Sequence, residues 1–133
     1  MKETSVAYEV SSPLSFEAAT ARVREALAKE GFGVLTEIDV RATMKAKLGI
    51  EGEPYVILGA CHPSSAHSAL AAAPEVGVLL PCNVTVSVQE GSTIVRAMKP
   101  QGVMGLLGVR ELEPVGAFVS AALQRVLEAC RQA

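Results

Sequence analysis

The sequence has no tryptophan, and it contains one asparagine, one aspartate and two histidines among its 133 residues. The scarcity of amide side chains is typical of proteins from heat-adapted sources, in which thermolabile residues are depleted. A single aspartate and scattered glutamates form no paired-carboxylate motif for general acid–base catalysis. The chain also lacks the phosphate-loop, dinucleotide-binding and nucleophile-elbow signatures. The sequence therefore identifies no reaction, and it leaves open whether the protein is an enzyme.

The charge balance and the longest apolar stretch exclude two classes of partner. The formal net charge is −2, so no basic surplus favours nucleic acid or an anionic membrane. The longest stretch of low charge, residues 66–88, is interrupted by Pro74 and Glu75, which a transmembrane helix would not carry at its middle. The first residues enter a strand pattern without the apolar core of a signal peptide. We expect a cytoplasmic protein that binds neither nucleic acid nor membranes.

The composition also predicts the redox state and the oligomeric state. Three cysteines are an odd number, and without an export signal we expect them to be reduced thiols. Hydrophobic residues make up 50% of the chain and charged residues 20%, which is below the usual quarter. The length is that of one domain, which we assign to residues 1–133. A subunit interface would hide the surplus apolar surface, so we expect a homodimer.

Five segments are predicted to be β-strands, most of them because apolar and polar residues alternate with a period of two. Residues 55–61 are instead a nearly continuous apolar run, which is typical of a central, covered strand. The predicted strands span residues 4–11, 32–39, 55–61, 78–89 and 92–98. Glu90 and Gly91, between the last two strands, are a hairpin turn signal. Pro81 removes a donor from the strand ladder, so it indicates an edge strand, a bulge or the start of a strand.

Helical spacing of the apolar residues predicts two long helices. Ser15 caps the first of them and Gly31 ends it, whereas Pro114 fits the first turn of the second. Short helices are predicted at residues 40–48 and 64–73.

The order of these elements predicts an α+β fold with two layers. The two long helices are expected to cover one face of a mainly antiparallel sheet of about five strands, with the short helices as additions. Residues 102–109 are apolar and glycine-rich, and as an exposed loop they would be a surface for a partner.

Several motifs lie in and around the stretch 55–88, which holds both histidines, the single asparagine and two of the cysteines. They are residues 59–63 (Gly-Ala-Cys-His-Pro), 74–84 (Pro-Glu-Val-Gly-Val-Leu-Leu-Pro-Cys-Asn-Val), 47–49 (Lys-Leu-Gly) and 98–100 (Met-Lys-Pro). With these motifs the chain resembles, over nearly its whole length, the family known as domain of unknown function three-hundred-two. After the first cysteine the family more often has asparagine, where this chain has His62.

This resemblance implies a fold of the TATA-binding-protein-like class, with the order β-α-β-β-β-β-α, which agrees with the order of the predicted elements. It does not imply DNA binding, because a fold does not determine a function. The family brings no assigned activity to this chain.

Cys61 and Cys82 are the candidates for a reactive site. They end and begin strands that are expected to be neighbours, so folding would allow a reversible disulfide, and His62 would help to activate the thiol beside it. The spacing is not Cys-x-x-Cys, so no redox motif supports this interpretation. If the protein is an enzyme, Cys61 and Cys82 are its candidate catalytic residues.

A metal site is a second interpretation of the same stretch. Cys61, His62, His67 and Cys82 are ligands of the type that zinc or copper uses, but their spacing matches no standard finger or ribbon. Cys61 and His62 would point to opposite sides of an extended chain, which leaves Cys61, His67 and Cys82 as the candidate ligands. We predict no cofactor.

A pocket for a small molecule or an anion is the functional interpretation that we favour. The backbone amides at the start of the helix that follows Pro63 would point at the motif of residues 59–63. The side-chain amide of Asn83 would donate from the adjacent strand. The expected ligand-binding residues are Cys61, His62, Ser64, Ser65, Cys82 and Asn83. In the structural interpretation, the cysteines are small buried hydrophobes and the serines are ordinary helix caps.

The sequence as a whole predicts a small-ligand-binding or protein-interaction module that acts as a homodimer. The alternative is a thiol-dependent redox or metal-handling protein that uses Cys61 and Cys82.

Overall fold

The computed structural model describes all residues, 1–133, and contains one antiparallel sheet of six strands in the order β1-β2-β6-β5-β4-β3. The predicted α+β fold is confirmed, with one strand more than expected. The extra strand, β1, has only two residues, too few to show an alternating pattern, and it pairs with β2. The strands are β1 (Lys2–Glu3), β2 (Ala7–Ser12), β3 (Gly33–Asp39), β4 (Tyr55–Cys61), β5 (Cys82–Gln89) and β6 (Ser92–Met98).

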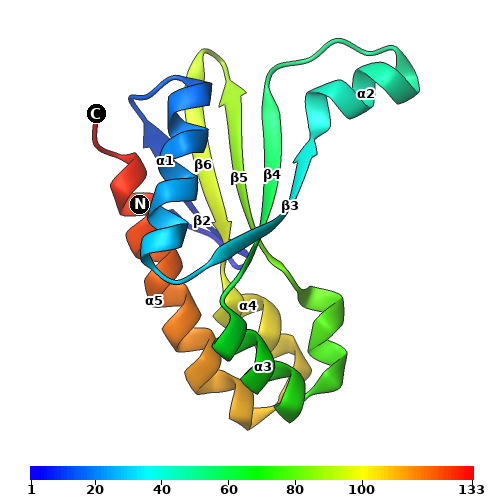
Figure 1. The fold of residues 1–133 in the computed structure, drawn as a ribbon, viewed down its shortest axis with the longest axis vertical. Helices are drawn as coiled ribbons and strands as arrows, with labels where there is room; N and C mark the ends of the chain where they lie inside the picture. The colour runs from blue at the N-terminus through cyan, green and yellow to red at the C-terminus, as the bar shows by residue number, and fades with distance from the viewer.

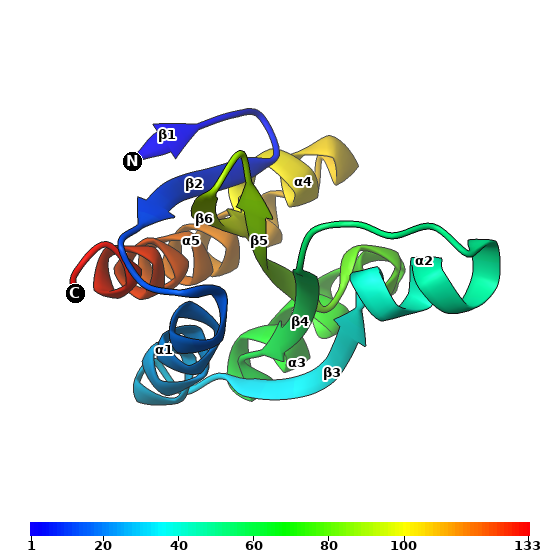
Figure 2. The same ribbon diagram turned by 90° about the horizontal axis from the view of Figure 1, so that it is seen from above.

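Two long helices, α1 (Phe16–Lys29) and α5 (Glu113–Cys130), lie against one face of the sheet, as Figures 1 and 2 show. The shorter helices are α2 (Val40–Leu48), α3 (Pro63–Ala72) and α4 (Pro100–Met104), and three short 3₁₀ helices are η1 (Pro74–Leu79), η2 (Gly105–Leu107) and η3 (Arg110–Leu112). No helix has the length and apolar character that crossing a membrane requires.

Local sequence signals determine where several elements begin and end. The Ser15 side chain accepts a hydrogen bond from the Ala18 amide at 3.1 Å and caps α1. Gly31 follows α1 with a φ of 83°, a left-handed conformation that glycine adopts without strain. Glu90 and Gly91 both have positive φ and form the two-residue turn that joins β5 to β6. These three predictions from the sequence are confirmed.

The main core lies between the sheet and the two long helices. In β5, Val84 and Val86 face the helices and are fully buried, whereas Asn83 and Gln89 lie on the other face and are exposed. The same alternation runs through β4, in which Leu58 is fully buried beneath α1 and α5. This face alone is covered by long helices, which is why period-two alternation predicts these strands well.

A second, smaller core lies below the end of the sheet, where α3, η1 and α4 pack together (Figure 1). Val76 is fully buried there. The prediction that a strand begins at Val78 was therefore wrong, because residues 74–79 form η1 and β5 begins at Cys82. Pro81 stands immediately before the strand, which is one of the three positions predicted for it.

The segment 102–109 is not the exposed apolar loop that we predicted. Most of it forms α4 and η2, and Met104 is buried in the second core. Gly102 packs so closely on the backbone of Ser5 that a β-carbon would clash with the Ser5 carbonyl oxygen. Among the large apolar side chains of this segment only Leu106 is strongly exposed, at 84%.

One part of the chain extends away from the body of the protein. We call residues 40–53, which comprise α2 and the loop that follows it, the arm. It connects β3 to β4 and projects beyond the sheet in Figures 1 and 2. Asp39 caps α2 by accepting from the Ala42 amide at 2.9 Å, and Gly49 ends it with a φ of 66°. Every residue from 41 to 53 is exposed.

Candidate ligand pocket

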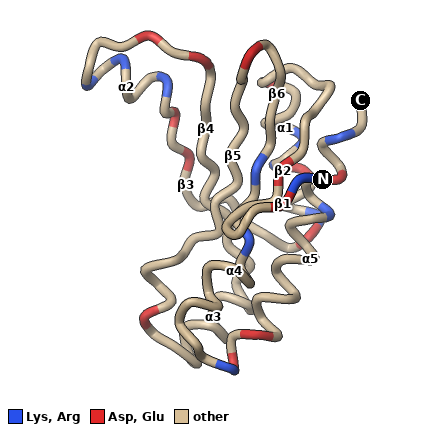
Figure 3. The backbone as a smooth tube through the Cα atoms, turned by 180° about the vertical axis from the view of Figure 1, so that it is seen from behind, with Lys and Arg blue, Asp and Glu red and all other residues tan.

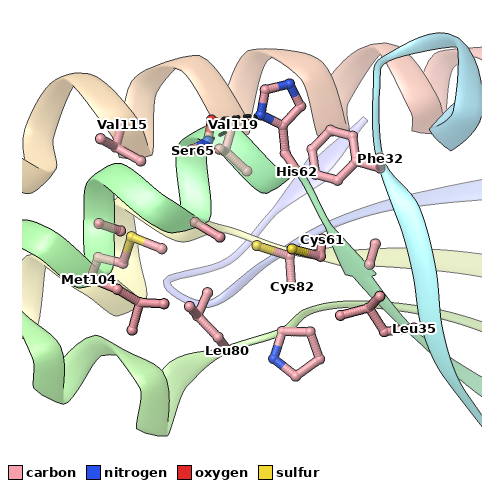
Figure 4. A pocket seen from close by; sticks show the side chains of 15 residues that line it. Phe32, Leu35, Cys61, His62, Ser65, Leu80, Cys82, Met104, Val115 and Val119 are labelled. Atoms are coloured by element: carbon pink, nitrogen blue, oxygen red, sulfur yellow. Dashed lines mark hydrogen bonds between the residues drawn. The ribbon is translucent and has the colours of Figure 1, made fainter.

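A cavity of about 300 Å³ lies where the two cores meet, between the ends of β4 and β5, α3 and α5. Residues of the main core, such as Phe32 and Val119, form one part of its wall, and Met104 of the second core forms another (Figure 4). Leu80 packs against both cores and lines the cavity between them. The cavity therefore exists because two packed units join imperfectly at the end of the sheet.

The wall of this cavity is almost entirely apolar. Of its fifteen residues twelve are hydrophobic, and none carries a formal charge at neutral pH. Its polar groups are the side chains of His62 and Ser65 and the thiols of Cys61 and Cys82. An ionised ligand group inside the cavity would lose its hydration without a charged partner, so the cavity suits an uncharged molecule.

His62 is the helix cap at one side of the cavity. Its Nδ1 accepts from the Ser65 amide at 3.4 Å and lies 2.8 Å from the Ser65 hydroxyl oxygen. Because Nδ1 accepts from an N–H group here, Nε2 is the ring nitrogen that is left to face other groups. The cap is thus the imidazole of His62 and not a serine hydroxyl.

Two phenylalanine rings hold the His62 ring in place. The ring centroids of Phe32 and Phe118 each lie 5.3 Å from that of His62, at tilted angles that aromatic pairs prefer. The geometry thus makes the His62 ring the cap that positions the start of α3, on one side of the cavity.

Cys61 and Cys82 line the same cavity from neighbouring strands, as Figure 4 shows. The Cα partner of Cys82 in β4 is Ala60, so the two cysteines are offset by one residue across the strand pair. All three cysteines are free thiols. Burial, and to a lesser degree the nearby charge of Cys61, raise the pKa of the Cys82 thiol to about 11. At neutral pH Cys82 is therefore protonated and a weak nucleophile.

The structure separates the remaining predicted site residues from this cavity. Ser64 and His67 are exposed on α3, and neither lines the cavity. Asn83 follows Cys82 in β5 and is exposed on the face of the sheet that carries no long helix. No group of three or more histidine, cysteine, aspartate or glutamate side chains is arranged to hold a metal ion.

Other groups approach the backbone at Gly59, where there is no side chain. A β-carbon at this position would clash with the Thr36 hydroxyl and the ring of Pro81. Gly59 therefore lets the chain that enters β5 pass directly beside β4, and this close passage forms one edge of the cavity.

Sequence reasoning missed most of the apolar wall. Leu35 lines the cavity because the pairing of β3 with β4 shifts its register between Val34 and Thr36, which period-two alternation does not reveal. Met104 comes from a segment that we predicted as a loop, and Val115 and Val119 belong to a long helix that we expected only to cover the sheet. A signal for Leu35 was present, since it is the one large apolar residue on the side of β3 that also carries Glu37 and Asp39.

Comparison with known proteins gives a family and a fold. Residues 8–130 match the model of the family described as domain of unknown function DUF302. The chain is similar to a crystal structure of an uncharacterized conserved DUF302 protein from Bacillus stearothermophilus, with 31% sequence identity and a TM-score of 0.89. This similarity covers 94% of this chain and 98% of the other. No curated protein matches the sequence.

Proposed function

The chain belongs to the DUF302 family, a family of unknown function, and we propose from the cavity itself that it is a homodimeric module that binds a small, uncharged, mainly apolar molecule. The observation that carries the proposal is the apolar wall of the cavity, which contains no charged side chain. Cys61, His62, Ser65 and Cys82 are the polar groups available to orient the ligand.

The volume of the cavity limits the size of the ligand. Since a water molecule occupies about 30 Å³ of liquid, a cavity of about 300 Å³ has room for a group of about ten non-hydrogen atoms. It lies at the lower end of the range for small-molecule sites. A bicyclic aromatic compound or a short aliphatic chain is of this size.

An anion, which we also considered, is less favoured by the geometry. No lysine or arginine lines the cavity, and the Ser65 amide at the start of α3 is already bonded to His62. A carboxylate or phosphate would thus lack both a cation and this free amide donor.

Indole, an uncharged molecule of nine non-hydrogen atoms, is a suitable probe, with indole-2-carboxylate as its charged counterpart. We expect indole to bind saturably, and the carboxylate to bind at least about tenfold more weakly because its charge would lose hydration. Isothermal titration calorimetry on the full chain measures both affinities. Absence of indole binding, or equal affinity for both compounds, would contradict the proposal.

A matched pair of variants on α3 tests the location of binding. Ala66 lines the cavity, whereas Ala72 is on the exposed side of the same helix. Ala66→Phe fills the cavity and should abolish indole binding, and Ala72→Phe should leave it unchanged. Circular dichroism of both variants shows whether they fold. Retained binding in folded Ala66→Phe would place the ligand elsewhere.

A thiol-dependent redox or metal-handling role remains the second candidate, because two free cysteines line one cavity. The raised pKa of Cys82 counts against it, since a protonated thiol is a poor nucleophile and a poor metal ligand. Treatment with the oxidant diamide, followed by intact mass measurement, separates the candidates. A loss of two daltons that a reductant reverses, and that Cys82→Ser abolishes, would favour the redox role.

A further inference from the structure

The arm buries no residue of its helix against its own chain, and what it contacts there is β3 and β4, the strands that it connects. Its helix α2 has nine residues, and none of them is buried. An isolated helix shorter than about 12 residues is marginal in water, and the helices of folded proteins are stabilised mainly by burying an apolar face. The caps at Asp39 and Gly49 determine the ends of α2 but do not supply such a face.

The arm nevertheless carries apolar residues at helical spacing. Val40, Met44 and Leu48 recur every four residues, so they lie along one side of α2, and Ile50 follows. Met44, Leu48 and Ile50 are 42%, 64% and 54% exposed. A stripe of this kind is what a helix presents to a partner.

A second group of exposed apolar residues lies on the same side of the molecule. In Figures 1 and 2 the arm extends from one end of β3, and α3 with η1 lies toward the other end. Leu35 at the start of β3, Leu70 of α3 and Val78 of η1 are 67%, 41% and 88% exposed. Most of the strongly exposed large apolar side chains of the chain belong to the arm, to β3 or to this α3–η1 surface.

The charges of the two surfaces are compatible with contact between them. The helix α2 carries Arg41, Lys45 and Lys47 and no acidic residue, whereas the only formally charged residue from 62 to 81 is Glu75 (Figure 3). The basic helix α2, with its apolar stripe, therefore complements the α3–η1 surface, which is apolar and carries one carboxylate. That surface has no lysine or arginine that would repel α2.

We propose that a second copy of this chain binds along the β3 side, with α2 of each subunit packed on the α3–η1 surface of the other. Because β3 separates the two surfaces, an antiparallel arrangement about a two-fold axis brings both pairs together at once. Of the 25 residues in segments 35–50 and 70–78, 22 are exposed and so available to an interface, which uses about 20 to 30 residues on each side.

A second copy is the partner that these observations favour, because both complementary surfaces lie on one chain. A different protein would have to present both an apolar groove for the arm and an apolar stripe for the α3–η1 surface. The inference rests on the homodimer of the proposed function. Leu35 and Leu70 belong both to this surface and to the wall of the ligand cavity, so the test uses residues outside the cavity wall.

Sedimentation velocity of the full chain between about 1 and 100 µM tests the interface, because association depends on concentration. We expect dimers, and we expect Leu48→Glu in the arm and Val78→Glu in η1 each to weaken association at least tenfold. Both side chains are strongly exposed within the chain, so these variants should fold. Leu106→Glu, at a position 84% exposed in η2, is the matched control and should associate like the wild type.

The outcomes distinguish the interface from the homodimer itself. A wild-type protein that is monomeric at every concentration would overturn both. A dimer that Leu48→Glu and Val78→Glu leave intact, or that Leu106→Glu weakens equally, would overturn the interface and leave the homodimer standing. Indole titration of the same samples reports ligand binding separately.

Discussion

The helices α1 and α2 carry the same local signals and have different surroundings. A side-chain oxygen caps each one, from Ser15 and Asp39, and a glycine of positive φ follows each one. Yet α1 buries four residues in the main core, whereas α2 buries none. The comparison teaches that caps determine where a helix begins and ends, while the burial of a face determines what the helix contributes to stability.

Helix caps and the burial of apolar side chains contribute different amounts to stability. A cap contributes about 1 kcal/mol, whereas a fully buried leucine or valine contributes about 1.5–3 kcal/mol relative to an exposed one. Val23 and Leu27 are fully buried in α1, and the corresponding apolar residues of α2 face solvent. The arm should therefore behave as a locally weak element until a partner covers it.

The largest expected difference comes from matched leucine-to-alanine variants. Leu27→Ala in α1 leaves a cavity in the main core and should lower the free energy of unfolding by about 2–5 kcal/mol. Leu48→Ala in α2 should change the free energy of unfolding of the monomer by less than about 0.5 kcal/mol. Urea denaturation at low protein concentration measures both. Equal losses would show that α2 is packed within the monomer.

Removing the caps gives an intermediate effect. Ser15→Ala should lower the free energy of global unfolding by about 1 kcal/mol, because α1 is part of the main core. Asp39→Ala should leave global unfolding of the monomer unchanged and accelerate amide hydrogen exchange within α2 alone. A drop in global stability from Asp39→Ala would contradict the description of the arm as a separate local unit.

The local features of the fold were predictable because neighbouring residues determine them. Alternation identified the strands with a buried face, and Ser15, Gly31 and the Glu90-Gly91 turn marked ends that the structure confirms. Residues 78 and 79 were misread as strand because alternation describes a sheet surface, whereas they belong to η1, which packs with α3 and α4 and buries Val76. Only the packing of distant segments shows that Val76 belongs to a second core.

The sequence predicted only the part of the candidate site that neighbouring residues determine. Cys61, His62, Ser65 and Cys82 line one cavity, but Asn83 points away because adjacent residues of a strand face opposite sides. Leu35 reaches the cavity through a register shift, and Met104 through a core formed with α3. Sequence patterns contain neither a register shift nor a contact between remote helices.

The smallest expected effect concerns two ion pairs, one between α5 and the end of α1 and one within the arm. Arg125 of α5 donates from Nε and Nη2 to Glu30 at the end of α1, and these bonds lower the pKa of Glu30 below its usual 4.5. A carboxyl group whose pKa is lower in the folded than in the unfolded state stabilises the fold at pH values above its unfolded pKa. This contribution to stability is lost as the pH falls through the lowered pKa. Wild type should therefore lose stability more steeply than Glu30→Gln as the pH falls below about 4.5.

The matched control is Glu51→Gln in the arm. The Lys45–Glu51 pair is 67% and 71% exposed, so it should contribute little to stability. Acid titration followed by circular dichroism compares the two variants. The account would be contradicted if Glu51→Gln changed the acid profile as much as Glu30→Gln.

The central claim is that α2 buries its apolar face only against a second copy of the chain. Amide hydrogen exchange of the wild-type protein at two concentrations, about 1 and 100 µM, tests this claim most directly. The amides of α2 and of η1 should exchange rapidly in the dilute sample and become protected in the concentrated one. The amides of α1 should be equally protected in both samples. Rapid exchange in α2 at both concentrations would contradict the account, and so would protection that does not depend on concentration.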